Sequence, residues 1–158
     1  ADTLNISWDL FRDRISTFQP PPGRCEIKKS KNMTFIDDTY NANVESTIAA
    51  IDYLTGFSGN GRRILIFGDM FELGDESKNQ HIKVGQKCIE SNLDYVFTVG
   101  TETLATHKSI TNGPKNMHFE TKEDLIKELK TEITDGDKIL VKGSRGMAME
   151  TIIETLMK

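Results

Sequence analysis

The feature that most constrains the fold is an alternation of short apolar runs with segments of helical periodicity, which continues from about residue 24 to the C-terminus. Several runs are rich in β-branched or aromatic residues, as strands are. Some are apolar throughout, which is typical of a sheet covered on both faces. The alternation predicts a Rossmann-like α/β fold, an open, mostly parallel sheet with helices on both faces. The expected strands are 33–36, 64–67, 95–99, 117–119 and 139–141.

Helices are expected between these strands and after the last one, because apolar residues recur there at the spacing of one helical face. Thr121, followed by Asp124, resembles a capping box, and Asn43 suits the N-cap of a helix that begins near residue 44. The four apolar faces consist of Ile48, Ile51 and Leu54; Ile82, Gly85 and Ile89; Leu125, Ile126 and Leu129; and Met149, Ile152, Ile153 and Leu156.

A proline run divides the chain near its start. Residues 20–22 are all proline and Gly23 follows, so a helix cannot continue through this segment, which forms a stiff spacer. Before it, Ile6, Trp8 and Phe18 belong to a partly helical apolar pattern. We therefore interpret 1–19 as the tail of a preceding domain, 20–23 as a linker and 24–158 as one compact domain.

Composition excludes some functions. The formal net charge of the 158 residues is −4, and the only small group of cations, Lys28, Lys29 and Lys31, is interpreted as a solvated turn. Nucleic-acid binding is therefore not expected, because phosphate contacts need clustered basic residues. Neither cysteine belongs to a CxxC pair, and no apolar run approaches the length of a membrane span. No signal peptide is recognisable either, and we expect a cytoplasmic protein.

The polar and glycine-rich segments follow strands. The segments 37–43, 68–74 and 142–146 come directly after the first, second and last expected strands. In open α/β sheets ligands bind beyond the carboxyl ends of the strands. We therefore expect these three segments to form one site.

The first segment, 37–43, combines carboxylates, amides and an aromatic hydroxyl. Its carboxylates can accept hydrogen bonds from sugar hydroxyls or hold a cation through water. Helix capping explains Asn43 about as well as a functional role does. Capping does not explain the whole run, so a binding role is favoured for Asp38 and Tyr40.

The second segment, 68–74, is also compatible with an ordinary strand-to-helix turn in which both glycines adopt positive φ. Asp69 and Glu72 add charge that such a turn does not need. His81 lies on the helix that follows, where a packed or half-exposed side chain is the usual outcome. His107 and His118 are expected at the surface, and no pair of histidines has metal-ligand spacing.

The third segment places two cations and a hydroxyl at the expected start of the last helix. Lys142, Ser144 and Arg145 suit a carboxylate or a phosphate there, because helix N-termini favour anions and arginine can bind a carboxylate through two hydrogen bonds. The alternative is a solvated loop, which the flanking apolar residues make less favourable. No GxxxxGK[ST] sequence, GxSxG sequence or Cys–His nucleophile pattern is present, so the chain carries no complete catalytic apparatus.

Four segments in order resemble the C-terminal domain of the Mur ligases: 22–24 at the domain junction, 37–43, 68–74 with Ser77 and His81, and 141–145 with Met149 and Glu150. The resemblance covers about 24–158 and points to the branch of the family that adds a dipeptide. Residues 1–19 resemble the end of the family's central ATPase domain.

The resemblance implies a cytoplasmic, monomeric three-domain enzyme of peptidoglycan synthesis that uses ATP and Mg²⁺, the metal being bound mainly by the central domain. In such enzymes ATP phosphorylates the carboxylate of UDP-N-acetylmuramoyl-tripeptide. The amine of D-Ala-D-Ala then attacks the acyl phosphate. This chain would contact the nucleotide and the acceptor, and the central and N-terminal domains would supply the other parts of the active site. Closure of the domains would bring the reactants together.

Site residues follow from the matched positions. The resemblance implies that the nucleotide is contacted by Arg24 at the phosphates, by Asp38 at the ribose, and by Tyr40 and Asn41 nearby. It implies that the dipeptide and closure region is lined by Asn43, Asp69, Glu72 and His81, and that the dipeptide is held by Lys142, Ser144 and Arg145.

One position departs from the family pattern, because Val44 stands where a proline is usual. Proline there mainly presets φ, so no functional loss is expected. We also expect the isolated chain not to hydrolyse ATP, since the P-loop, the Mg²⁺ ligands and the sugar-binding domain are missing from it.

Three alternatives stay open. A free-standing, non-catalytic module for a small anionic ligand would not distinguish D-Ala-D-Ala from L-Ala-L-Ala, whereas a ligase domain would. The chain could instead be fused to another cell-wall enzyme such as an alanine racemase. A relative with a different acceptor is the third.

Overall fold

The computed structural model describes residues 7–17 and 20–158. Its helices are α1 (Trp8–Ser16), α2 (Val44–Thr55), α3 (Ser77–Glu90), α4 (Leu104–Ser109), α5 (Lys122–Glu132) and α6 (Glu150–Leu156). Two short 3₁₀ turns, η2 (Gly74–Glu76) and η3 (Arg145–Met147), precede α3 and α6. The strands are β1 (Glu26–Ser30), β2 (Met33–Asp38), β3 (Arg63–Gly68), β4 (Tyr95–Val99), β5 (Lys115–Phe119) and β6 (Lys138–Lys142).

The strands form one sheet in the order β1-β2-β6-β3-β4-β5. All neighbours are parallel except β1 and β2, which form an antiparallel hairpin at one edge. The mostly parallel α/β sheet is therefore confirmed. Strand β1 was not predicted, and the interpretation of Lys28 and Lys29 as a solvated turn is wrong. In a half-exposed edge strand, polar side chains alternate with only one apolar residue, Ile27, which hides the strand pattern.

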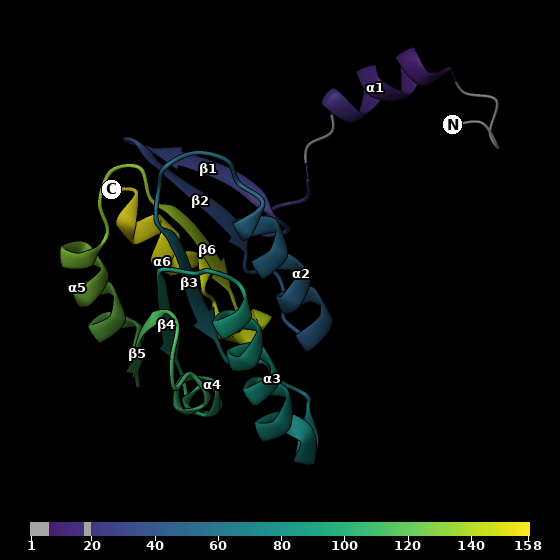
Figure 1. Ribbon diagram of the computed structural model, residues 1–158. Coiled ribbons are helices and arrows are strands. Elements are labelled where there is room, and N and C mark those ends of the chain that lie inside the picture. Colours follow the sequence, from purple (N-terminus) through teal and green to yellow (C-terminus); the bar gives the residue numbers. More distant parts are fainter. Residues whose placement is uncertain (1–6, 18–19) are drawn as a thin grey trace.

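Helices cover both faces of the sheet (Figure 1). On one face, α2 and α3 pack on Ile36, Leu65 and Leu140, and on the other face α5 and α6 pack on Phe35, Ile66 and Ile139. Consecutive strand residues therefore point into opposite cores, as the pleat requires. Because both faces are covered, residues 64–67 of β3 and 139–141 of β6 are apolar throughout, as was predicted for some of the strands.

Local capping sets the start of two helices. Asn43 forms a capping box with Ser46 at α2, and the Thr121 hydroxyl accepts the Asp124 N–H at α5. The predicted cap at Asn43 is confirmed. At Thr121 the cap bond is present, but the Asp124 carboxylate accepts the Thr121 hydroxyl instead of the backbone N–H that a capping box requires. The buried face of α3 differs from the expected one by one position, because His81, Val84, Gly85 and Cys88 are buried. A Cβ on Gly85 would lie 2.8 Å from the Thr106 carbonyl oxygen, so α4 approaches α3 closely at this glycine.

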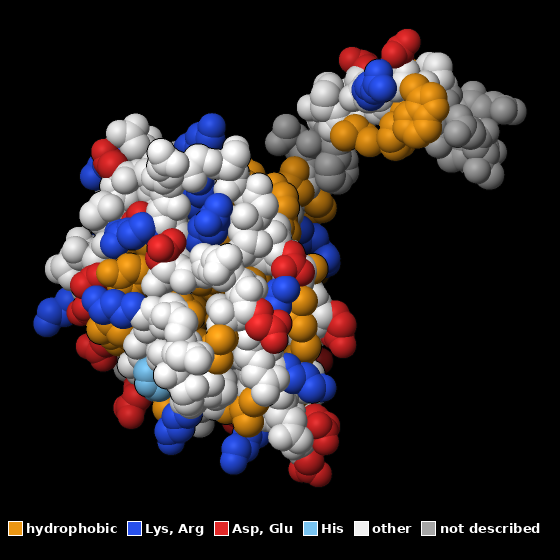
Figure 2. Space-filling view, in the orientation of Figure 1, with side chains coloured by type: hydrophobic (Ala, Val, Ile, Leu, Met, Phe, Trp, Pro, Cys, Tyr) orange, Lys and Arg blue, Asp and Glu red, His pale blue; other side chains and the backbone are white. Residues whose placement is uncertain are grey.

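Helix α1 has no buried residue among those described. Its apolar side chains, Trp8, Leu10, Phe11 and Ile15, are exposed and appear as an orange patch apart from the sheet in Figure 2. The domain boundary near residue 20 stays a prediction, and Ile6 and Phe18, which belonged to the expected apolar pattern, lie outside the described residues. No helix in the described part of the chain is long and apolar enough to cross a membrane.

Candidate functional site

The three polar segments meet at one end of the sheet. They follow β2, β3 and β6, which are adjacent in the order β2-β6-β3 and parallel, so their carboxyl ends lie side by side. Two cavities lie there, one of about 520 Å³ and one of about 210 Å³. Both are lined by the segment 40–43, which forms a shared wall between them.

The smaller cavity brings together all four residues predicted to contact a nucleotide, Arg24, Asp38, Tyr40 and Asn41. The Arg24 guanidinium lies over the Tyr40 ring, 4.2 Å from its centroid. This cation–π contact keeps the arginine beside the cavity. A carboxylate, a cation and an aromatic ring can together bind sugar hydroxyls, phosphate and a flat base.

The larger cavity contains four of the residues predicted to contact the acceptor, Asn43, Glu72, Ser144 and Arg145. Arg145 is 65% exposed and donates to the Glu150 carboxylate through Nη1 at 2.9 Å. Among the described residues the other guanidinium nitrogens of Arg145 have no partner, so they remain available to an anion. The cavity has both charged and apolar walls, since Phe71, Leu73 and Gly146 also line it.

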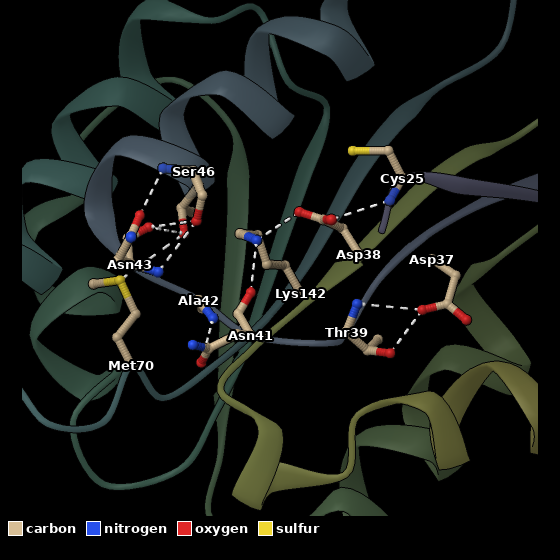
Figure 3. A network of polar contacts seen from close by, with 11 residues as sticks. Cys25, Asp37, Asp38, Thr39, Asn41, Ala42, Asn43, Ser46, Met70 and Lys142 are labelled. Atoms are coloured by element: carbon tan, nitrogen blue, oxygen red, sulfur yellow. Dashed lines mark hydrogen bonds and ion pairs between the residues drawn. The ribbon is translucent and has the colours of Figure 1, made fainter. Parts of the chain in front are cut away.

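A buried ion pair supports the shared wall (Figure 3). The Lys142 ammonium, only 1% exposed, lies 2.5 Å from Asp38 Oδ2 and donates to the Asn41 carbonyl at 2.9 Å. The other Asp38 oxygen accepts the Cys25 N–H at 3.0 Å. Lys142 therefore links the Asp38 carboxylate to the backbone of the wall. Lys142 lines the smaller cavity, whereas it was predicted to hold the acceptor dipeptide.

Asp37 and Asp38 have different roles although they are adjacent. Asp37 is buried, pairs with Lys28 of β1 at 2.5 Å and accepts the Thr39 hydroxyl at 2.7 Å. Successive residues of a strand point to opposite faces, so only Asp38 faces the cavity. Asp37 instead ties the edge strand to the sheet.

Asp69 lies behind the cavity wall. Its carboxylate accepts the backbone N–H groups of Thr101, Glu102 and Thr103 at 2.8–3.0 Å, and its side chain is buried. The loop after β4 wraps it so closely that a Cβ on Gly100 would lie 2.5 Å from the carboxylate. Asp69 lines neither cavity, and we assign it the role of holding the loop after β3 against the loop after β4.

His81 is also buried behind the wall, 0% exposed. Its Nε2 atom accepts the Met70 N–H at 3.1 Å, and its Nδ1 atom lies 2.8 Å from the Ser77 carbonyl oxygen. Because the Met70 N–H can only donate, Nε2 carries no proton and Nδ1 donates to Ser77. The imidazole therefore ties the loop after β3 to the first turn of α3 and lines neither cavity.

Ser144 completes this support. Its hydroxyl accepts the Phe71 N–H at 2.7 Å, and its own N–H donates to the Asp69 carbonyl at 2.9 Å. The loop also turns at Glu72 (φ 62°) and Gly74 (φ 53°). The expectation of positive φ is confirmed for Gly74 and wrong for Gly68, where a Cβ would lie 2.7 Å from the Met149 sulfur, so close packing explains that glycine.

The third segment does not open directly into a helix. Residues Arg145–Met147 form the 3₁₀ turn η3, Ala148 adopts a left-handed conformation, and α6 begins only at Glu150. The expected helix N-terminal anion site is therefore wrong. The positive charge at the cavity comes from the Arg145 side chain itself.

The two remaining histidines form no metal site. His107 and His118 are half-buried, with ring centroids 5.7 Å apart, and their expected surface position is only partly correct. The pKa of His118 is lowered by burial and by the neighbouring His107. Among residues 7–17 and 20–158, no three His, Cys, Asp or Glu side chains lie close enough to hold a metal ion.

Sequence reasoning missed Cys25 and Phe71 as members of the site. Cys25 has positive φ and gives its N–H to Asp38, while Phe71 lines the larger cavity. The role of Cys25 belongs to its backbone N–H group. Such a role does not depend on the residue type, so the sequence gives no sign of it. Phe71 did leave a signal, because it is the one aromatic residue in the segment 68–74.

The Asp38→Asn variant is expected to make the Cys25 thiol several times more reactive. Burial and the Asp38 carboxylate raise the Cys25 pKa to about 11, so only about one thiol in a thousand is ionised at pH 8. Removing the carboxylate's charge lowers that pKa and raises the thiolate fraction. Iodoacetamide labelling followed by mass spectrometry measures the rate.

Cys88 serves as an internal control, because burial raises its pKa to about 12 and it stays unlabelled in a folded chain. Equal Cys25 rates in both proteins, with Cys88 protected, contradict the prediction. Labelling of Cys88 would instead report unfolding of the variant.

Comparison with known proteins places this geometry in a family. The family model described as "Mur ligase, glutamate ligase domain" matches residues 23–145, which include every residue that lines the two cavities except Gly146. The chain belongs to the Mur ligase family. The predicted resemblance is therefore confirmed, and the sheet described above is the fold of the family's C-terminal domain.

Two similar curated proteins share one name. The chain is 37% identical to the UDP-N-acetylmuramoyl-tripeptide–D-alanyl-D-alanine ligase of Escherichia coli over 99% of its own length and 34% of that protein. It is 34% identical to the Bacillus subtilis enzyme of the same name over 84% of its length and 30% of that protein. The chain thus spans about a third of the length of the curated relatives it matches.

Solved structures agree with this placement in the family. The chain superimposes with a TM-score of 0.82 on a MurF structure from Acinetobacter baumannii, at 33% identity, covering 98% of this chain and 34% of the other. A MurF ligase from Thermotoga maritima in complex with ADP gives a TM-score of 0.81 at 28% identity, with the same coverage. The Mur ligase likeness therefore extends through the described fold.

Proposed function

We propose that the chain is the C-terminal domain of an ATP-dependent ligase that joins D-Ala-D-Ala to UDP-N-acetylmuramoyl-tripeptide in peptidoglycan precursor synthesis. The observation that carries the proposal is the pair of cavities separated by the wall 40–43. The smaller cavity has the groups that suit a nucleotide, and the larger cavity has a cation that suits a carboxylate. The names of the relatives and the ADP complex of a solved neighbour support both assignments.

In the smaller cavity the nucleotide contacts follow from the chemistry of the side chains. Asp38 accepts hydrogen bonds from ribose hydroxyls, and Arg24 binds the phosphates. Tyr40 holds Arg24 through the cation–π contact, and Asn41 offers an amide beside it. Lys142 holds the Asp38 carboxylate in position, so it acts on the nucleotide through that carboxylate.

In the larger cavity Arg145 binds the carboxylate of the incoming dipeptide. Asn43 and Glu72 also line this cavity and offer an amide and a carboxylate that can orient the dipeptide amine. Ser144 holds the loop that carries Glu72, and Asp69 and His81 hold it from behind. These assignments refine the predicted acceptor set into groups that touch the dipeptide and groups that position the wall.

The reaction needs groups that lie outside this chain. ATP supplies the phosphoryl group that activates the tripeptide carboxylate, and Mg²⁺ with the remaining phosphate ligands is assigned to a central domain. The dipeptide nitrogen then forms a bond to the activated carbonyl carbon, the carbon–oxygen bond to phosphate breaks, and the nitrogen loses a proton. This chain contributes proximity, because adjacent cavities bring nucleotide and amine together.

Residues 1–19 are assigned to that central domain, 20–23 to the linker and 24–158 to the acceptor domain. The exposed apolar side chains of α1 are consistent with a helix that packs on another domain. The isolated chain is accordingly expected to bind ligands without hydrolysing ATP, and its free cysteines favour the cytosol. Mg²⁺-dependent ATP turnover by the pure chain would contradict this assignment.

A titration of the isolated chain tests the proposal at the level of binding. In ¹⁵N-NMR spectra, ADP should shift the amides around Asp38, and D-Ala-D-Ala should shift those around Arg145. L-Ala-L-Ala serves as the matched control and should shift the second set much less at equal concentration. Equal responses to both dipeptides would favour a general anion-binding module and contradict the ligase assignment.

In the full-length enzyme, Arg145→Ala is expected to raise the KM for D-Ala-D-Ala about 10- to 100-fold, the range for losing a hydrogen bond to a charged group. The KM for ATP should change less than about twofold, because Arg145 lies outside the smaller cavity. Steady-state release of phosphate measures both constants.

The matched variant is Arg24→Ala, which should show the reverse pattern, since Arg24 lines only the smaller cavity. If Arg145→Ala instead weakens ATP and leaves the dipeptide KM unchanged, the role given to Arg145 is wrong.

A further inference from the structure

The larger cavity has an apolar wall to which the proposed function gives no role. Phe71 forms part of this wall and is 43% exposed, although it stands in a loop whose other members are mostly polar or glycine. A large exposed apolar side chain costs solubility without stabilising a core. Its position beside a cation and polar groups is what a binding site for a small amphipathic ligand requires.

The Phe71 ring is held in place rather than free. Its N–H donates to the Ser144 hydroxyl at 2.7 Å, and the preceding N–H, of Met70, donates to His81. The ring lies against Gly146, where a Cβ would be 2.9 Å from ring atom Cε2. The absence of a side chain at Gly146 therefore creates the space that the ring edge occupies.

The Phe71 ring and the Arg145 side chain line the same cavity. Gly146, on which the ring rests, directly follows Arg145, whose side chain is 65% exposed. In an amino acid the carboxylate and the side chain are attached to the same carbon. A carboxylate bound by Arg145 therefore directs the side chain of that same residue toward the neighbouring surface of Phe71 and Gly146.

We propose that Phe71, which packs on Gly146, limits the size of the side chain on the C-terminal residue of the incoming dipeptide. This inference rests on the proposed function. The ring provides apolar contact for a methyl group and blocks the space that a longer side chain would need. Discrimination by such a contact is typically about 10- to 200-fold for one methylene group.

The test compares two dipeptides in the full-length enzyme, D-Ala-D-Ala and D-Ala-D-norvaline, by the ratio of their kcat/KM values. Phe71→Ala removes the barrier and should lower the preference for D-Ala-D-Ala at least about tenfold. Gly146→Ala adds a methyl group to the wall and displaces the ring, so it should raise the preference. Gly146 does not have positive φ, and the close atoms all belong to the Phe71 ring, so its backbone is not strained.

The control variant is Tyr53→Ala, which removes another exposed aromatic side chain, 46% exposed, from α2 outside both cavities. It should leave the ratio unchanged. If the two cavity variants also leave the ratio within about twofold of wild type, the inference is wrong while the proposed function stands. A wild-type enzyme that uses neither dipeptide overturns the proposed function and this inference with it.

Discussion

Replacing Lys142 with methionine is expected to lower the free energy of unfolding of the chain by about 3–5 kcal/mol, the cost of leaving one member of a buried ion pair without its partner. The side chain of Asp38 is only 13% exposed and would lose its 2.5 Å contact with the ammonium. The Asn41 carbonyl would lose a hydrogen bond as well. Urea denaturation followed by circular dichroism measures the change.

Lys138→Met provides the matched control from the same strand. Lys138 is 9% exposed, and its ammonium donates to the carbonyl oxygens of Ser58 and Gly59 rather than to a carboxylate. Its loss should cost less than the loss of Lys142, about 1.5–3 kcal/mol, because it leaves two carbonyl groups but no buried charge without a partner. The double variant Asp38→Asn with Lys142→Met should recover part of the stability lost by Lys142→Met alone. If Lys142→Met costs no more than Lys138→Met, the pair is not what stabilises this end of the sheet.

Asp69→Asn is expected to cost about 3 kcal/mol, because the carboxylate satisfies three backbone N–H groups through two oxygens, asparagine can keep at most two of these bonds, and each bond to a charged acceptor contributes about 1.5–3 kcal/mol. An asparagine side chain offers one oxygen and turns its NH₂ group toward an N–H donor. The loop around Gly100 is too close to the carboxylate to admit a rearrangement without moving. Denaturant unfolding and amide hydrogen exchange at residues 101–103 report the loss.

Asp94→Asn is the corresponding control at the opposite end of β4. Asp94 is exposed, and its carboxylate accepts the N–H of Arg63 at 2.7 Å. The same substitution should therefore cost less than about 1 kcal/mol. Similar losses at Asp69 and Asp94 would show that the number of bonds to the carboxylate does not decide the cost.

The sheet could be predicted because its signals are local. Strands β2, β3, β4 and β6 carry runs of buried apolar residues, and the predicted limits of 95–99 match β4 at both ends. Other limits differ by one or two residues, because polar residues such as Lys138 and Lys142 extend β6 at each end while their ammonium groups find partners. Strand β1 was missed because its stability comes from pairing with β2, including the contact of Lys28 with Asp37.

The location of the site was also predictable, since the rule about carboxyl ends needs only the order of strands and polar segments. The separate roles of the residues within the site could not be predicted. Asp38 and Asp69 are both acidic residues at strand ends, yet one lines a cavity and the other is buried under three N–H donors. The roles differ because the backbone N–H groups of residues 101–103, which are distant in the sequence, bind Asp69. The residue types in the sequence do not reveal this contact.

The shared wall at 40–43 has a thermodynamic consequence. One short segment, tied to β6 by Lys142, contributes surface to both cavities, so it cannot shift toward one ligand without changing the shape offered to the other. Any such shift acts as a coupling free energy, which must be equal in both directions. If filling the smaller cavity tightens the larger one by some factor, filling the larger one tightens the smaller by that same factor.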